Sequence, residues 1–181
     1  MKKILLILTF IFISINCFAD IQYGNNSVSV DSTGDWTFST MAFGEMGVSY
    51  NALATTVSSS SVYYQVTQNV IVGAGITNMT FANAAITLSV DGTYMIVSSM
   101  SFSGANNADI HGGISIDGAQ PEGDHSFSRK LGAGGDIGNI GTVEVHALTT
   151  GQTISMQVEN ITNTNDIVVE HMNITVIKVA P

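Results

Sequence analysis

The sequence predicts an all-β protein, an antiparallel two-sheet jelly-roll sandwich. After residue 20, apolar and polar residues alternate with a period of two, which is typical of strands with one buried face. Asp-Gly, Thr-Gly and Asn-rich turns separate the alternating segments, and no helical period is sustained. Strands at such spacing, divided by such turns, indicate a sandwich or a barrel.

Residues 1–19 are predicted to be an export signal. Two lysines precede an apolar run over 4–15, and Ala19 supplies a small residue for cleavage. The run is shorter than the roughly 20 residues of a bilayer span. We therefore expect a secreted or virion-surface protein, with no membrane span once the signal is removed. Lipid attachment at Cys17 and a retained hydrophobic anchor stay open as alternatives.

Residues 20–43 are predicted to be a polar lead-in or linker. This segment has few apolar residues in phase, and one short strand is expected around Ser27–Val30. Trp36 and Phe38 are predicted to pin its end to the following domain. The jelly-roll domain itself is expected over residues 44–181.

Four strands of that domain stand out in the alternation. One contains Tyr94, Ile96, Ser98, Met100 and Phe102 on a single face; two others alternate over 142–147 and 153–159; the last runs from Ile167 to Val179.

The last of these strands carries apolar residues on both faces. One face is expected to hold Val168, Met172, Ile174 and Val176, and the other Ile167, Val169, Thr175 and Ile177. A strand that is apolar on both faces is buried on both sides. The pattern therefore predicts that one face lies in the core and the other against a partner subunit.

The charge balance excludes two classes of partner. The basic residues after the signal are Arg129, Lys130 and Lys178, against fourteen acidic residues. Such a surface repels nucleic acid and anionic lipid. Cys17 is the only cysteine, so no disulfide can stabilise the exported chain, and stability must come from sheet packing or oligomerisation.

An ordered set of motifs runs through residues 44–181. Its members are Gly44-Glu45-Met46, Asp91-Gly92-Thr93-Tyr94, Ser128-Arg129-Lys130-Leu131-Gly132, Gly135-Asp136-Ile137-Gly138 and the run from Val169 to Val176. With these motifs the chain resembles the jelly roll of tumour necrosis factor and the complement globular head. It is most similar to the variants on bacteriophage tail fibres, head fibres and other virion appendages, and in some secreted bacterial proteins.

The resemblance implies a ten-stranded jelly roll that assembles as a tight homotrimer about a three-fold axis. It implies a structural or recognition role and brings no catalytic residues. Two features depart from the phage proteins: the lead-in is too short for an attachment domain, and virion proteins rarely need an export signal. Both favour a secreted or surface protein of a bacterium.

The four histidines lack the spacing of a metal site on one helix face. His171 lies in the middle of an apolar strand, which indicates a hydrogen-bonded core or interface histidine. If a three-fold axis passes near it, three copies would bind a metal, an anion or a ligand, or would sense pH. The same two interpretations apply to His146.

Arg129 and Lys130 are adjacent and would point to opposite faces of a strand. An ion pair with Asp136 or Glu170 is the structural interpretation, and contact with a carboxylate of a ligand is the functional one. The two basic residues and His171 are the predicted ligand-binding candidates.

The acidic stretch 117–124 is the candidate metal site, with Asp117, Glu122 and Asp124 as oxygen ligands for calcium. It lacks the order of acids of an EF-hand, so a plain solvated loop is the alternative. No other cofactor is expected.

No pattern of catalytic residues is recognisable. The chain has no Gly-x-Ser-x-Gly elbow and no cysteine nucleophile after the signal. We expect no enzyme activity, and predict a trimeric module on a virion appendage or cell surface that binds a glycan or protein multivalently. A secreted bacterial ligand-binding protein of the same fold and a glycan-active enzyme are the alternatives.

Overall fold

The computed structural model describes residues 21–23, 26–30, 36–38, 41–121 and 126–181, with side chains over the last two ranges. The chain divides into two compact units, residues 1–41 and residues 42–181. Every regular element in the described part is a strand, and none of it forms a helix that could cross a membrane. The predicted export signal lies outside the described residues.

The first unit contains a small antiparallel sheet in the order β1-β2-β3. Its strands are β1 (Ile21–Tyr23), β2 (Asn26–Val30) and β3 (Trp36–Phe38). The strand expected around Ser27–Val30 is present as β2, and it pairs with both neighbours. The sequence predicts one strand here and the structure has three, because β1 and β3 have three residues each, too few for a visible alternation. The predicted pinning by Trp36 and Phe38 concerns side chains outside the described ones.

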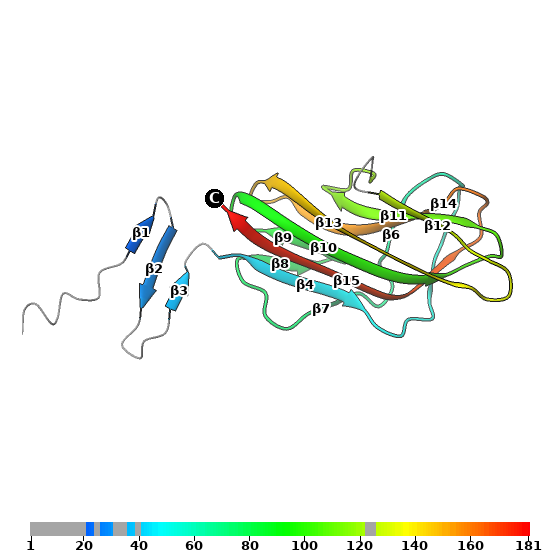
Figure 1. Cartoon of the computed structure of the whole chain (residues 1–181), viewed down its shortest axis with the longest axis horizontal. Helices are drawn as coiled ribbons and strands as arrows, with labels where there is room; N and C mark the ends of the chain where they lie inside the picture. Colours follow the sequence, from blue (N-terminus) through cyan, green and yellow to red (C-terminus); the bar gives the residue numbers. More distant parts are fainter. Residues whose placement is uncertain (1–20, 24–25, 31–35, 39–40, 122–125) are drawn as a thin grey trace, which may run out of the picture. The chain divides into compact units, whose positions relative to one another are not determined.

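The second unit is a sandwich of two antiparallel sheets. The first sheet has the order β13-β10-β15-β4-β7, with β5 pairing beside β15 (Figure 1). Its strands are β4 (Phe43–Val48), β5 (Ala54–Thr55), β7 (Ile71–Val72), β10 (Gly92–Ser103), β13 (Ile137–Leu148) and β15 (Ile167–Ala180).

The second sheet lies behind the first in the view of Figure 1 and has the order β12-β11-β14-β9-β8, with β6 pairing beside β14. Its strands are β6 (Tyr64–Gln65), β8 (Met79–Ala82), β9 (Ala85–Leu88), β11 (Asp109–Ile116), β12 (Ser126–Lys130) and β14 (Thr153–Asn160). From β9 onward the chain passes repeatedly from one sheet to the other, which is the connectivity of a jelly roll.

The core lies between the two sheets. The five residues predicted to share one face of β10 are all buried there, which confirms the alternation: Tyr94, Ile96, Ser98, Met100 and Phe102. From the opposite sheet β14 contributes Ile154, Met156 and Val158, each fully buried. Burial of each such side chain stabilises the fold by about 1.5–3 kcal/mol.

Strand β14 is buried on both faces, although only one of them is apolar. Its second face carries Ser155, Gln157 and Glu159, all of them buried. The Gln157 Nε2 group donates hydrogen bonds to the Ser115 hydroxyl at 3.0 Å and to the Gly118 carbonyl at 3.4 Å. Side chains on this outer face are therefore stabilised by hydrogen bonds as well as by packing.

The prediction of which residues share a face of β15 is wrong. Residues 167, 169, 172, 174 and 176 are the buried ones, so both predicted faces contribute to the core. The cause is a β-bulge: Ser101 pairs with His171 and Phe102 pairs with Val169, which leaves Glu170 as an extra residue. An extra residue shifts the pleat by one, so the outward face changes phase at this point.

Beyond the bulge, the outward face of β15 is mixed. It carries His171, Asn173 and Thr175, followed by Ile177 and Val179 toward the C-terminus. Only its last part is apolar.

Substitution of Ile174 tests the core. Ile174 is fully buried on β15, whereas Ile71 on the edge strand β7 is 61% exposed. Ile174→Ala should lower the free energy of unfolding by about 2–5 kcal/mol, because it removes buried methyl groups and leaves a cavity. Ile71→Ala, the matched control, should change it by less than about 1 kcal/mol. Denaturant unfolding of both variants measures the difference. Equal losses in the free energy of unfolding would contradict the burial of Ile174 in the core.

Candidate functional site: the exposed face of the first sheet

The middle of strand β13 presents its two valines to solvent. Val143 and Val145 are each 63% exposed, whereas the side chain of Glu144 between them is 5% exposed. A strand on the surface of a stable monomer normally has the opposite polarity, with valines in the core. The inverted pattern indicates that this outer face is covered by something else.

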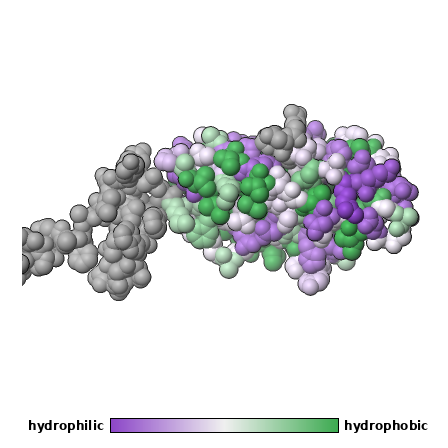
Figure 2. All heavy atoms as spheres, in the orientation of Figure 1, coloured by the Kyte–Doolittle hydropathy of each residue, from purple (hydrophilic) through white to green (hydrophobic). Residues whose placement is uncertain are grey.

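The exposed valines belong to a larger apolar surface. In register across the sheet, Val145 pairs with Met95, Met95 with Ile177, and Ile177 with Phe43. Side chains in one such row point to the same face of a sheet. We call this surface the apolar patch; it consists of Phe43, Met95, Val97, Val143, Val145, Ile177 and Val179. Figure 2 shows hydrophobic residues gathered over this end of the first sheet, near the C-terminus.

The other half of the same face is hollowed and carries serine, asparagine and histidine side chains among apolar ones. One hollow of about 410 Å³ lies between Tyr50, Ser103 and His171, and a second of about 240 Å³ lies between Ser101, Asn139 and His171. His171 lines both, so the two hollows are neighbours, and we call them together the polar groove. The face is thus divided into an apolar patch and a polar groove.

His171 is on the surface, not in the core. It follows the β-bulge, its side chain is exposed, and its ring lies edge-on to the ring of Tyr50 with centroids 4.7 Å apart. Of the two predicted places for this histidine, core or interface, the core is wrong, because His171 alternates with the buried Met172 and so faces outward; the interface stays a prediction. The predicted ligand-binding role stays a prediction, now with a surface hollow beside it.

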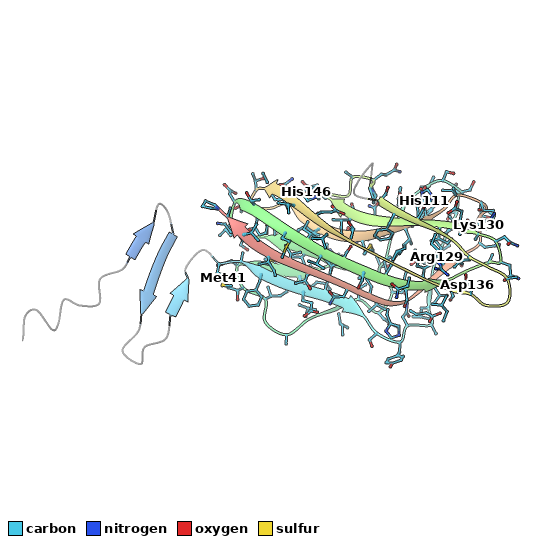
Figure 3. All side chains as sticks on the ribbon, viewed as in Figure 1. Met41, His111, Arg129, Lys130, Asp136 and His146 are labelled. Carbon is cyan, nitrogen blue, oxygen red and sulfur yellow. The ribbon has the colours of Figure 1, made fainter. Side chains whose placement is uncertain are left out.

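Arg129 forms an ion pair with Asp136, one of the two partners predicted for it. The Arg129 Nη2 group lies 3.2 Å from Asp136 Oδ2, and both side chains are partly exposed (Figure 3). Asp136 also accepts a hydrogen bond from the Gly132 backbone N–H at 2.7 Å. That backbone N–H, assisted by Arg129, holds the pKa of Asp136 below its usual value. Lys130 is exposed on β12.

Of the three predicted calcium ligands, the structure describes Asp117 alone, so the calcium site stays a prediction. Asp117 lies in the left-handed region at φ 54° and caps a turn, as the Asp-Gly motif predicts. Its carboxylate accepts hydrogen bonds from Gln152 Nε2 at 2.9 Å and the Thr153 backbone N–H at 2.8 Å, which lower its pKa. Glu122 and Asp124 lie outside the described residues. Within the described ranges no group of three or more His, Cys, Asp or Glu residues could hold a metal.

Two histidines lie beside carboxylates that were not predicted from the sequence: His146 beside Glu144, and His111 beside Glu159 and, with Nε2 at 3.8 Å from Oδ1, beside Asp109. His146 Nε2 lies 2.9 Å from Glu144 Oε2 on the inner face of β13. On the outer face of the second sheet, His111 Nδ1 lies 3.2 Å from Glu159 Oε1. Burial, together with the Glu159 carboxylate, raises the pKa of Tyr63 to about 12.

The first of these pairs has a signal in the sequence, since residues two apart on a strand share a face. The second depends on the pairing of β11 with β14, which the sequence alone does not specify. Figure 3 shows His111 and His146 on different strands.

Comparison with known proteins defines the fold. No protein-family model matches the chain, and no curated protein matches it. A solved structure, that of the Eiger tumour necrosis factor from S. frugiperda, is similar with a TM-score of 0.52 and 12% sequence identity. The match covers 77% of this chain and 94% of that one. The matched part of this chain therefore has a jelly-roll fold like that of tumour necrosis factor, as the sequence motifs predict.

The pH dependence of stability tests whether the interactions of the Asp136 carboxylate with the Gly132 N–H and Arg129 stabilise the fold. Because its pKa is lower in the folded chain, the Asp136 carboxylate stabilises the fold above its unfolded pKa of about 3.9, and this contribution is lost as the pH falls through the folded pKa. The melting temperature of Asp136→Asn should lie below that of the wild type above about pH 5 and converge with it below about pH 3.

Arg129→Gln is the matched variant, because it leaves the Gly132 hydrogen bond in place and should have the smaller effect. A difference in melting temperature between wild type and Asp136→Asn that does not change with pH would contradict this stabilisation by the carboxylate.

Proposed function

We propose that this chain is an exported, non-enzymatic recognition module that assembles as a homotrimer through the apolar patch. It is displayed on a virion appendage or a cell surface and binds a glycan or protein partner. The single observation that carries the proposal is the inverted polarity of β13, which exposes Val143 and Val145 and buries Glu144. Covering these valines by a neighbouring copy removes apolar surface from water and supplies the stability that disulfides cannot give.

The geometry of the sheet supports the contact between copies. The apolar patch spans four paired strands, β13, β10, β15 and β4, so it is a broad, rigid surface. A closed ring of three requires that this patch meet a different surface of the next subunit. The similarity to a tumour-necrosis-factor structure and the resemblance of the motifs to trimeric jelly rolls point to the same assembly.

A trimer also explains how a shallow site can be useful. Three identical copies on one rigid assembly turn a weak contact into a strong one, because the second and third contacts form at high effective concentration. The acidic composition directs the module away from nucleic acid and anionic lipid. Function then depends on binding and needs no nucleophile or catalytic acid–base pair.

The mass in solution tests the assembly. Light scattering coupled to size-exclusion chromatography should give about three times the chain mass for residues 20–181. Val143→Glu should yield monomers, because a charge on the β13 side of the apolar patch would be buried in the contact without a partner. Ile161→Glu, at an exposed apolar residue outside the patch, should stay trimeric. A wild-type monomer, or a Val143→Glu variant that keeps the trimer mass, would refute the proposed contact.

A further inference from the structure

The polar groove lies on the same sheet face as the apolar patch. It crosses the ends of β10 and β15 and is bordered by β13 through Asn139 and by the segment after β4 through Tyr50. His171 lines both of its hollows. Two neighbouring hollows on rigid strands are suited to an extended ligand.

Tyr50 is the most unusual residue of the groove. Its side chain is 88% exposed, and its backbone lies in the left-handed region at φ 53°, which tyrosine rarely adopts. Hydrogen bonds of the next residue hold this backbone conformation in place. The Asn51 N–H donates a hydrogen bond to the Glu170 carbonyl at 3.0 Å, and Asn51 Nδ2 donates one to the Val169 carbonyl at 3.2 Å. An aromatic ring is thereby held out in solvent next to His171 on a backbone tied to β15.

The floor of the groove offers neutral hydrogen-bonding groups. The side chains of Ser99, Ser101 and Asn139 make no hydrogen bond to another residue in the described part of the chain. Their hydroxyl and amide groups both donate and accept. They can therefore bind a ligand that carries many hydroxyl groups.

The charge around the groove selects against anions. Glu170 lines the first hollow, the chain has a formal net charge of −9, and His171 is the only basic side chain among the lining residues. A phosphate, sulfate or carboxylate would meet repulsion here. A ligand with apolar C–H faces and no charge would instead pack against the Tyr50 ring, whose negative face attracts C–H groups.

We propose that the polar groove binds a neutral oligosaccharide, which stacks one sugar ring on Tyr50 and directs hydroxyl groups to Ser101, Asn139 and His171. This names the ligand class and the site of the recognition function proposed above, on which it rests. The site lies on the sheet face, at the bulge of β15, and not at Arg129 and Lys130.

Glycan binding by the full chain tests this site. The wild type is applied to an array of immobilised neutral, sialylated and sulfated oligosaccharides, and the affinity for the best neutral glycan is then measured by titration. Tyr50→Ala should weaken that affinity by roughly tenfold or more, whereas Tyr50→Phe should retain most of it, because the ring makes the contact. Asn139→Ala should weaken it through lost hydrogen bonds.

Leu53→Ala is the matched control, since Leu53 is exposed in the same segment and does not line either hollow. Light scattering on every sample records the assembly state independently. If neutral glycans bind equally to wild type, Tyr50→Ala and Asn139→Ala, the groove is not the site, although recognition stands. If no neutral glycan binds, or only acidic ones do, the proposed ligand class is wrong, and the mass measurement alone decides whether the trimeric assembly survives.

Discussion

Packing of the first sheet against the second is the interaction on which the rest of the second unit depends. Tyr94, Ile96 and Phe102 of β10 and Ile154 and Met156 of β14 belong to one core between the sheets, and all are fully buried. Because successive side chains on a strand point to opposite faces, burial of one set leaves the intervening residues of β10 outside. Hydrogen bonding then extends that outer face to β13 on one side and to β15 on the other. The composition of the exposed sheet is thus a consequence of the core.

The exposed face combines two physically different halves. Near the C-terminus, β10, β13 and β15 direct valine, methionine and isoleucine outward, and the hydrophobic effect favours covering them. Toward the other end the same three strands direct serine, asparagine and histidine outward, and these groups are best satisfied by water or by a polar ligand. One sheet face therefore has one half suited to assembly and another suited to a polar ligand, which are the roles that we propose for them.

The β-bulge in β15 connects these two halves. Without the extra residue at Glu170, the alternation that buries Met172 and Ile174 would leave Ile167 and Val169 in solvent, on the same face as His171. With it, both apolar pairs reach the core. His171 stays on the outward face, beside Tyr50, and lines both hollows.

The sequence by itself determined the fold class, the main strands and the turns, because period-two alternation and Asp-Gly chemistry are local properties. It also identified the ion-pair partner of Arg129 as one of two acids. Which face of β13 is buried, where β15 changes phase, and that Tyr50 meets His171 were decided only by the tertiary structure. Each depends on pairing between strands far apart in the chain, and a shift of one residue in that pairing exchanges the core face for the solvent face.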